Sequence, residues 1–180
     1  KFILILKICS FLVFFGRGWQ HVFWDAPYRT FFWNQQLLKG VVEGLTSMSW
    51  QEYVTSPVVD NIIQGLIIGV GFFYFGLAIL CLVLNERMLK RGKLLLLGSF
   101  SLLILSFLYY AEKFFYLGML IEHSIQVGVP VVLYISLFKE NYFDKYLLFY
   151  KSLIALTFLG HGMFAFGIHP VPGPFIDMFI

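Results

Sequence analysis

The chain has 180 residues, of which 59% are apolar, 20% aromatic and 13% charged. A soluble domain carries about 25% charged residues, so this composition excludes that class and indicates an integral membrane protein whose partner is the lipid bilayer. The net charge of +3 is small, and the basic residues gather at loop ends, so the sequence does not predict a nucleic-acid-binding surface.

Five apolar segments approach the length of about 20 residues that an α-helix needs to cross a bilayer. They are residues 2 to about 23, 61–84, 94–110, 114–138 and 146–168. The third and fourth are joined either at Ala111, Glu112 and Lys113 or by a turn nearer Gly118. The sequence therefore predicts an all-α, polytopic transmembrane helix bundle with about five spanning helices. We expect residues 1–180 to be a single transmembrane domain of a longer chain, since the sequence begins without methionine and stops within an apolar run.

The segment 24–60, between the first two spans, contains several tryptophans and tyrosines, which settle at the level of the lipid headgroups. Apolar residues recur in it at helical spacing from Leu37 onward, and residues 49–52 have the Ser-x-x-Glu form of a helix capping box. We therefore expect one or two short interfacial helices that lie over the outer mouth of the bundle.

Lysine and arginine residues in short loops indicate the orientation of a membrane protein, because such loops stay in the cytoplasm. Residues 85–93 include four basic residues and one acidic residue. Alternation of the spans then places Lys1 and the segment 139–145 on the same side. We expect the N-terminus in the cytoplasm, the segments 24–60 and 169–180 on the outer side, and, for a bacterial source, a location in the inner membrane.

Ionisable side chains within the spans indicate where function resides, because such groups are costly in hydrocarbon. Arg17, His21 and Asp25 follow one another at i, i+4 and i+8, so a continuous helix would place them along one stripe. Pro27 then predicts a structured turn from which Arg29 can return to a carboxylate.

Two later spans place ionisable groups at a depth similar to that of Arg17. Glu122 lies about 12 Å and His161 about 10 Å from the outer ends of their segments, at a rise of 1.5 Å per residue. We expect Glu122 to face the bundle interior and to pair with Arg17 or His161, while Gln126, at i+4, extends the network. His123 lies about 100° around the helix from Glu122, so the two do not face one pocket squarely.

The histidines and cysteines are the candidate metal ligands of the chain. All four histidines fall in the outer half of the chain's spans or beyond it: His21, His123, His161 and His169. Together they could hold a haem or a transition metal, but no two have the i, i+3 or i, i+4 spacing of helical metal sites, which favours a polar network without metal. His169 is interpreted as a helix-end residue. Cys9 and Cys81 lack a metal or disulfide spacing and are interpreted as packing residues.

Four short motifs carry a family resemblance. They are Phe15-Gly16-Arg17-Gly18-Trp19, the glycine-rich stretch 65–76, Glu122-His123-Ser124-Ile125-Gln126 ahead of Pro130, and Leu156-Thr157-Phe158-Leu159-Gly160-His161-Gly162. In these motifs the chain resembles the DoxX-like group of small bacterial membrane proteins, which includes the small subunit of thiosulfate:quinone oxidoreductase. The resemblance implies a four-helix core and an association with membrane redox chemistry. The segment 24–60 and the fifth span depart from the family's compact pattern.

The first functional hypothesis is an accessory or binding module. Its polar pocket in the outer leaflet would hold a quinone or another small amphiphile, beside a possible membrane redox partner. Arg17, Glu122 and His161 would supply hydrogen bonds or exchange protons, and aromatic residues would line the pocket.

Two other functions stay open. A proton-coupled transporter would use Glu122 and His161 as a relay, but it needs polar groups toward the cytoplasmic half, where the sequence has few. A membrane-embedded enzyme would place its site at the outer face, with His21, Asp25 and His169. The sequence indicates neither a specific substrate nor an oligomeric state.

Overall fold

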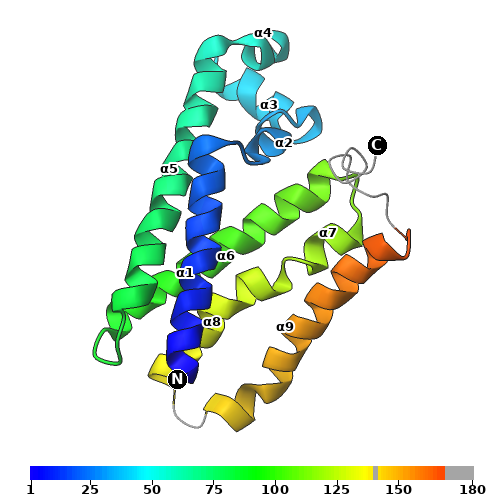
Figure 1. Ribbon diagram of the computed structural model, residues 1–180. Coiled ribbons are helices and arrows are strands. Elements are labelled where there is room, and N and C mark those ends of the chain that lie inside the picture. Colours follow the sequence, from blue (N-terminus) through cyan, green and yellow to red (C-terminus); the bar gives the residue numbers. More distant parts are fainter. Residues whose placement is uncertain (140–141, 169–180) are drawn as a thin grey trace.

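The computed structural model describes residues 1–139 and 142–168 and confirms the all-α bundle. The described residues form nine helices and no strand, and five stretches are long and apolar enough to cross a membrane (Figure 1). These stretches are α1 (Phe2–Phe23), α5 (Pro57–Val83), α6 (Leu89–Glu112), α7 with α8 (Leu117–Ile121 and Ser124–Phe138), and most of α9 (Tyr142–Ala165). The fourth stretch is therefore interrupted, where the sequence predicted one continuous helix.

The main core lies among α1, α5, α6 and α8, which confirms the four-helix core. Each of these helices contributes a side chain that is completely buried: Phe14, Tyr74, Leu95 and Leu133. The fifth spanning helix, α9, packs mainly against α7 and α8 at one edge of the bundle (Figure 1). Most of its surface is left to contact lipid.

Two glycines bring α1 and α5 into close contact. A Cβ atom added to Gly18 would lie 3.0 Å from the carbonyl oxygen of Gly71, and one added to Gly71 would lie 3.0 Å from Cβ of His21. Small residues at a helix crossing permit such an approach in membranes. Arg17, one residue before Gly18, is turned about 100° around α1 from this contact and so faces away from α5.

The turn between the third and fourth spans lies at residues 113–116, between the two positions that the sequence allowed. It is a Schellman motif: the N–H of Phe115 donates to the carbonyl of Tyr110 (2.9 Å), and their rings pack edge to face at 5.3 Å. The backbone φ angle is 54° at Phe114 and 62° at Phe115. Glycine adopts this left-handed region freely, whereas phenylalanine is strained in it.

Replacing Phe114 by glycine should therefore stabilise the protein by about 1 kcal/mol, because left-handed backbone costs an L-residue about 1–2 kcal/mol. The Phe114 side chain is 82% exposed, so few contacts are lost. Thermal unfolding in detergent measures the effect. The control is Phe107→Gly, at an exposed position inside α6, which should destabilise by about 1 kcal/mol instead. A similar loss of stability in both variants would contradict the assignment of strain to the turn.

The segment 24–60 contains three short helices rather than one or two; following the predicted orientation, we call the end of the bundle that carries this segment the outer end. They are α2 (Tyr28–Phe32), α3 (Gln35–Leu45) and α4 (Trp50–Thr55). The predicted capping box is confirmed, since Ser49 and Glu52 each accept the other's backbone N–H at the start of α4. Ala26 and the adjoining α2 pack against α5 and α6.

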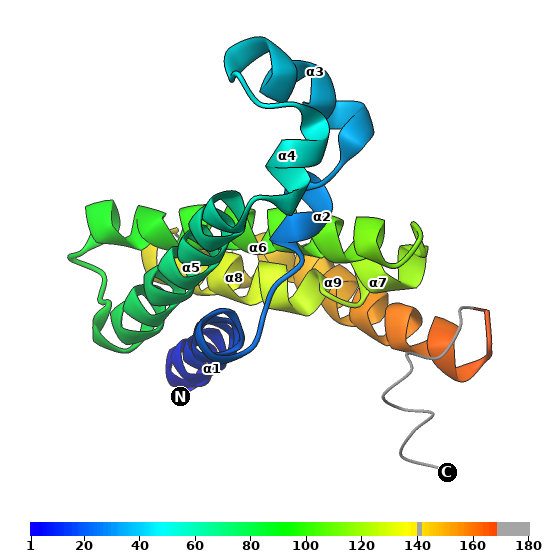
Figure 2. The same ribbon diagram turned by 90° about the horizontal axis from the view of Figure 1, so that it is seen from above.

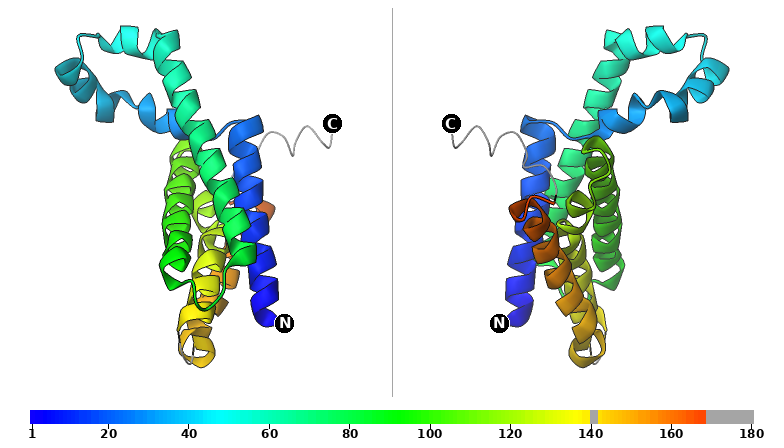
Figure 3. Two further views of the ribbon diagram at one scale, coloured as in Figure 1. Left: turned by 90° about the vertical axis from the view of Figure 1, so that its left-hand side faces the viewer. Right: turned by 90° about the vertical axis from the view of Figure 1, so that its right-hand side faces the viewer.

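The position of α3 and α4 differs from the prediction. They project sideways beyond the edge of the bundle instead of covering its mouth (Figures 2 and 3). In addition, α5 begins earlier than predicted, at Pro57 rather than at residue 61. The extra turn, about 6 Å long, carries α4 away from the ends of the other spans.

Candidate functional site

Arg17 occupies the centre of a polar cluster in the outer half of the bundle. Its Nε and Nη2 donate to Oε1 of Gln126 on α8 (3.0 and 2.7 Å), and its Nη1 donates to Oε1 of Gln20 (2.7 Å). The guanidinium lies over the ring of Tyr109 on α6, 5.4 Å from its centroid. The side chain of Arg17 thus connects three of the four core helices.

The charge of Arg17 is held by neutral groups. Among the described residues, no carboxylate lies within 4 Å of its guanidinium. The ion pairs of the described residues join Arg29 to Asp25 and Asp60, and His123 to Glu122. On its inner side, next to Leu105 and Ser106, the remaining void is too small to admit a water molecule. An arginine held in this way has a positive charge that an incoming electron-rich oxygen can interact with strongly.

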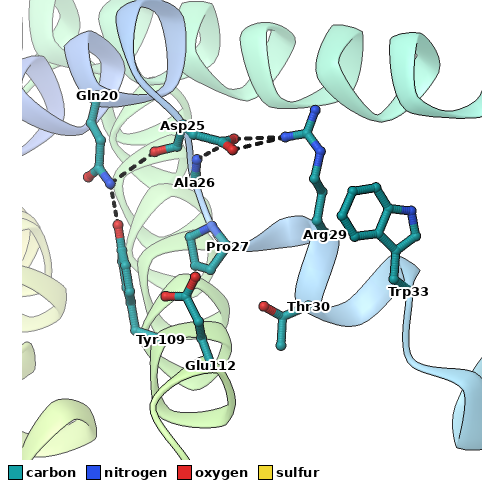
Figure 4. A pocket seen from close by; sticks show the side chains of 9 residues that line it. All are labelled: Gln20, Asp25, Ala26, Pro27, Arg29, Thr30, Trp33, Tyr109 and Glu112. Carbon is teal, nitrogen blue, oxygen red and sulfur yellow. Dashed lines mark hydrogen bonds and ion pairs between the residues drawn. The ribbon is translucent and has the colours of Figure 1, made fainter. Parts of the chain in front are cut away.

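Gln20 extends the polar cluster from Arg17 toward the outer surface. Its Nε2 donates to the main-chain carbonyl of Asp25 (3.1 Å) and to the hydroxyl of Tyr109 (Figure 4). These bonds attach the end of α1 to α6. They also place Gln20 between two clefts, both of which it lines.

The larger cleft opens at the outer surface and has a volume of about 490 Å³. Figure 4 shows the residues that line it: Gln20, Asp25, Ala26, Pro27, Arg29, Thr30, Trp33, Tyr109 and Glu112. Arg29 forms ion pairs with Asp25 (3.0 Å) and Asp60 (2.9 Å). The sequence predicted that the side chain of Arg29 contacts a carboxylate at this turn. The hydrogen bond with Asp60 and the charge of Asp25 raise the pKa of Arg29 above its ordinary value.

The second cleft, of about 390 Å³, lies between α1 and α8. We call it the lateral cleft, and it is lined by Leu12, Val13, Gly16, Arg17, Gln20 and Gln126. One end is apolar and the other holds the Arg17 cluster. A Cβ atom added to Gly16 would meet nothing within 4 Å, so the absence of a side chain there leaves the cleft open.

Asp25 does not continue the stripe of Arg17 and His21, because α1 ends at Phe23 and Asp25 lies in the following turn. His21 is completely buried. Its Nδ1 lies 2.7 Å from the carbonyl oxygen of Arg17, and its ring packs edge-on against Tyr74 at 5.2 Å. His21 therefore supports the outer part of the core, while Asp25 belongs to the outer cleft.

Glu122 and His123 form the interruption between α7 and α8 (Figure 1). His123 is buried against Tyr109, with stacked rings 5.4 Å apart, and its Nδ1 lies 2.7 Å from the carbonyl oxygen of Met119 and 3.7 Å from Oε1 of Glu122. Among the described residues Glu122 forms an ion pair within 4 Å with neither Arg17 nor His161, the two predicted partners, and Gln126 takes its place beside Arg17. The angle of about 100° expected between the side chains of Glu122 and His123 assumed a continuous helix. The two residues lie between the end of α7 and the start of α8 instead.

The first turn of α8 is capped from α9. The hydroxyl of Thr157 accepts the backbone N–H of Ile125 (3.0 Å), a group that an interrupted helix leaves without an intrahelical partner. Three residues later, a Cβ atom added to Gly160 would lie 2.6 Å from the backbone nitrogen of Glu122. The side chain of His161 is exposed and makes its hydrogen bond to the carbonyl of Thr157 (2.9 Å). His169 lies outside the described residues.

Sequence reasoning missed several residues of this site. Gln20, Tyr109 and Thr157 each form a hydrogen bond in it. Gln20 could have been found, because it is a polar residue one turn from Arg17 within an apolar segment. Within the described ranges, no three histidine, cysteine, aspartate or glutamate side chains gather as a metal site would require.

No protein-family model, no curated protein and no solved structure matches this chain. The resemblance to the DoxX-like group therefore rests on the short motifs alone.

Proposed function

We propose that this chain is a membrane-embedded accessory module that binds a quinone or another small amphiphile in the outer half of the bilayer. The protein would lie in a bacterial inner membrane with its N-terminus in the cytoplasm and would act beside a redox partner. The observation that carries the proposal is the lateral cleft, in which an apolar wall leads to an arginine held by neutral amides.

The donors of Arg17 suit a ligand that presents carbonyl oxygens. A guanidinium has five N–H groups. Three of them donate to Gln20 and Gln126 as described, which leaves two for a ligand. A quinone carbonyl accepts such bonds, and its ring and tail would lie along Leu12 and Val13. A volume of about 390 Å³ falls in the range of small-molecule sites.

The resemblance to the DoxX-like group supports the redox part of the proposal, because Gly16 and Arg17 of the first motif line the lateral cleft. Glu122 and His161 do not line it. We therefore assign hydrogen bonding to Arg17, Gln20 and Gln126, and assign Glu122 and His123 to the α7–α8 interruption.

A side chain at Gly16 tests this site without removing any of its polar groups. Gly16→Phe fills the lateral cleft and should weaken binding of a short-chain benzoquinone to the purified protein by about tenfold or more, equivalent to about 1.4 kcal/mol. Quenching of tryptophan fluorescence provides the measurement. The control is Gly69→Phe, since Gly69 is also exposed, with open space around its Cα. Equal affinities for the wild type and Gly16→Phe would contradict the proposal.

A second candidate, a proton-coupled transporter, is favoured by two observations. The interrupted fourth span is of the kind found at transporter binding sites. In addition, the buried hydroxyls of Ser10, Ser99 and Ser136 have no hydrogen-bond partner among the described residues, and they lie toward the end that holds the N-terminus. Proton flux into proteoliposomes, abolished by Glu122→Gln, would support this function, and equal flux with and without the protein would exclude it.

A further inference from the structure

A third cleft lies at the opposite end of the bundle from the Arg17 cluster, beside the N-terminus. It has a volume of about 400 Å³ and is formed by the start of α1, the loop between α5 and α6, and the end of α8. The residues that line it are Ile3, Lys7, Leu84, Asn85, Glu86, Arg87 and Leu137. None of them takes part in the outer clefts.

The inner surface of this cleft is apolar and its rim is basic. Leu84 is 0% and Leu137 9% exposed, so the floor belongs to the packed core. Lys7 extends along α1, and its Nζ donates to the carbonyl oxygen of Leu82 (3.3 Å) in the last turn of α5. This bond fixes the ammonium at the cleft and leaves two of its three N–H groups for other acceptors.

Neither Lys7 nor Arg87 is held in an ion pair within the described part of the protein. This holds to a distance of 4 Å, although Glu86 also lines the cleft. The same end of the bundle carries Lys90 and Arg91 in the first turn of α6. The cleft therefore lies in a positive potential.

We infer that this cleft binds the phosphate headgroup of an anionic phospholipid from the adjoining leaflet. The phosphate would lie between Lys7 and Arg87, where ammonium and guanidinium groups donate to its oxygens. The glycerol and the first part of the acyl chains would cover Ile3 and Leu137. Basic pockets between spanning helices at a membrane surface recognise lipid headgroups in this way. The site does not depend on the function proposed for the outer clefts.

Retention of phospholipid by the purified full chain tests the inference. After exchange into a mixture of phosphatidylglycerol and phosphatidylcholine with identical acyl chains, native mass spectrometry should find phosphatidylglycerol retained preferentially. Arg87→Gln should reduce that retention about tenfold, because it removes charge-assisted hydrogen bonds from the guanidinium to the phosphate. Lys7→Gln should also reduce the retention. Because Lys7 donates a hydrogen bond to the last turn of α5, its replacement can also affect the fold, so the exposed Arg87 is the decisive position.

The matched control is Arg91→Gln, which removes the same charge from the same end but lies outside the cleft. Retention in this variant should stay within about twofold of the wild type. An equal loss in Arg91→Gln and Arg87→Gln would attribute binding to diffuse surface charge and overturn the inference. Displacement of the lipid by millimolar inorganic phosphate would also overturn it, because the apolar floor would then contribute nothing.

Discussion

Replacing Gln126 by leucine should destabilise the protein by about 2–3 kcal/mol. The change removes the acceptor of two Arg17 N–H groups, which lie 3.0 and 2.7 Å from Oε1 of Gln126, at a partly buried site between α1 and α8. A hydrogen bond to a charged group contributes about 1.5–3 kcal/mol, and leaving the charged partner unsatisfied makes the loss larger than the average for a neutral bond. Thermal unfolding can be followed with a thiol-reactive dye, since Cys81 is completely buried in the folded state.

The control for this prediction is Gln126→Glu, which has the same shape and keeps an acceptor oxygen opposite Arg17. It should unfold within about 1 kcal/mol of the wild type. The same variant should bind the short-chain benzoquinone more weakly, because a carboxylate at this position neutralises the arginine. If Gln126→Leu were as stable as the wild type, Arg17 would not be the centre of the polar cluster.

Gly160→Ala should separate α9 from the rest of the bundle. The added Cβ would lie 2.6 Å from the nitrogen and 2.8 Å from Cα of Glu122, which are backbone atoms that cannot rotate away. The helix must therefore shift, at a cost of about 1–3 kcal/mol. The shift removes the hydrogen bond from the N–H of Ile125 to Thr157. Hydrogen exchange of the peptide that covers residues 121–127 should become faster.

Gly162→Ala is the matched control, two residues further along α9. Its added Cβ would meet the ring of Phe166 no closer than 3.9 Å, so exchange at residues 121–127 should be unchanged. Alanine also has the higher helix propensity, by about 1 kcal/mol, so this variant should be slightly more stable than the wild type. Equal exchange rates in Gly160→Ala and Gly162→Ala would show that α9 does not depend on this contact.

The spanning helices and their core could be predicted from the sequence because apolar length alone defines a membrane helix. The capping box at Ser49 was also predictable, since both of its partners lie within four residues. That Gln126, and not Glu122, contacts Arg17 could not be predicted. This contact depends on how α1, α6 and α8 pack against one another, and spacing within one segment does not give that packing.

The interruption of the fourth span has no local signal in the sequence. The bends expected of a spanning helix come from proline, yet α8 continues through Pro130 and the break lies eight residues earlier. Its stability comes from α9: the hydroxyl of Thr157 satisfies the backbone, and the lack of a side chain at Gly160 makes room. Such support from a distant helix cannot be inferred from spacing within one segment.

Photoaffinity labelling with an azido-substituted quinone would locate the ligand site on the chain. On purified protein in lipid nanodiscs, the label should attach to the part of α1 between Leu12 and Gln20, which lines the lateral cleft, and excess unlabelled quinone should suppress it. Gly16→Phe should remove the label from that peptide. Label spread evenly over the lipid-facing surface of α9, and insensitive to competitor, would contradict a ligand site at Arg17.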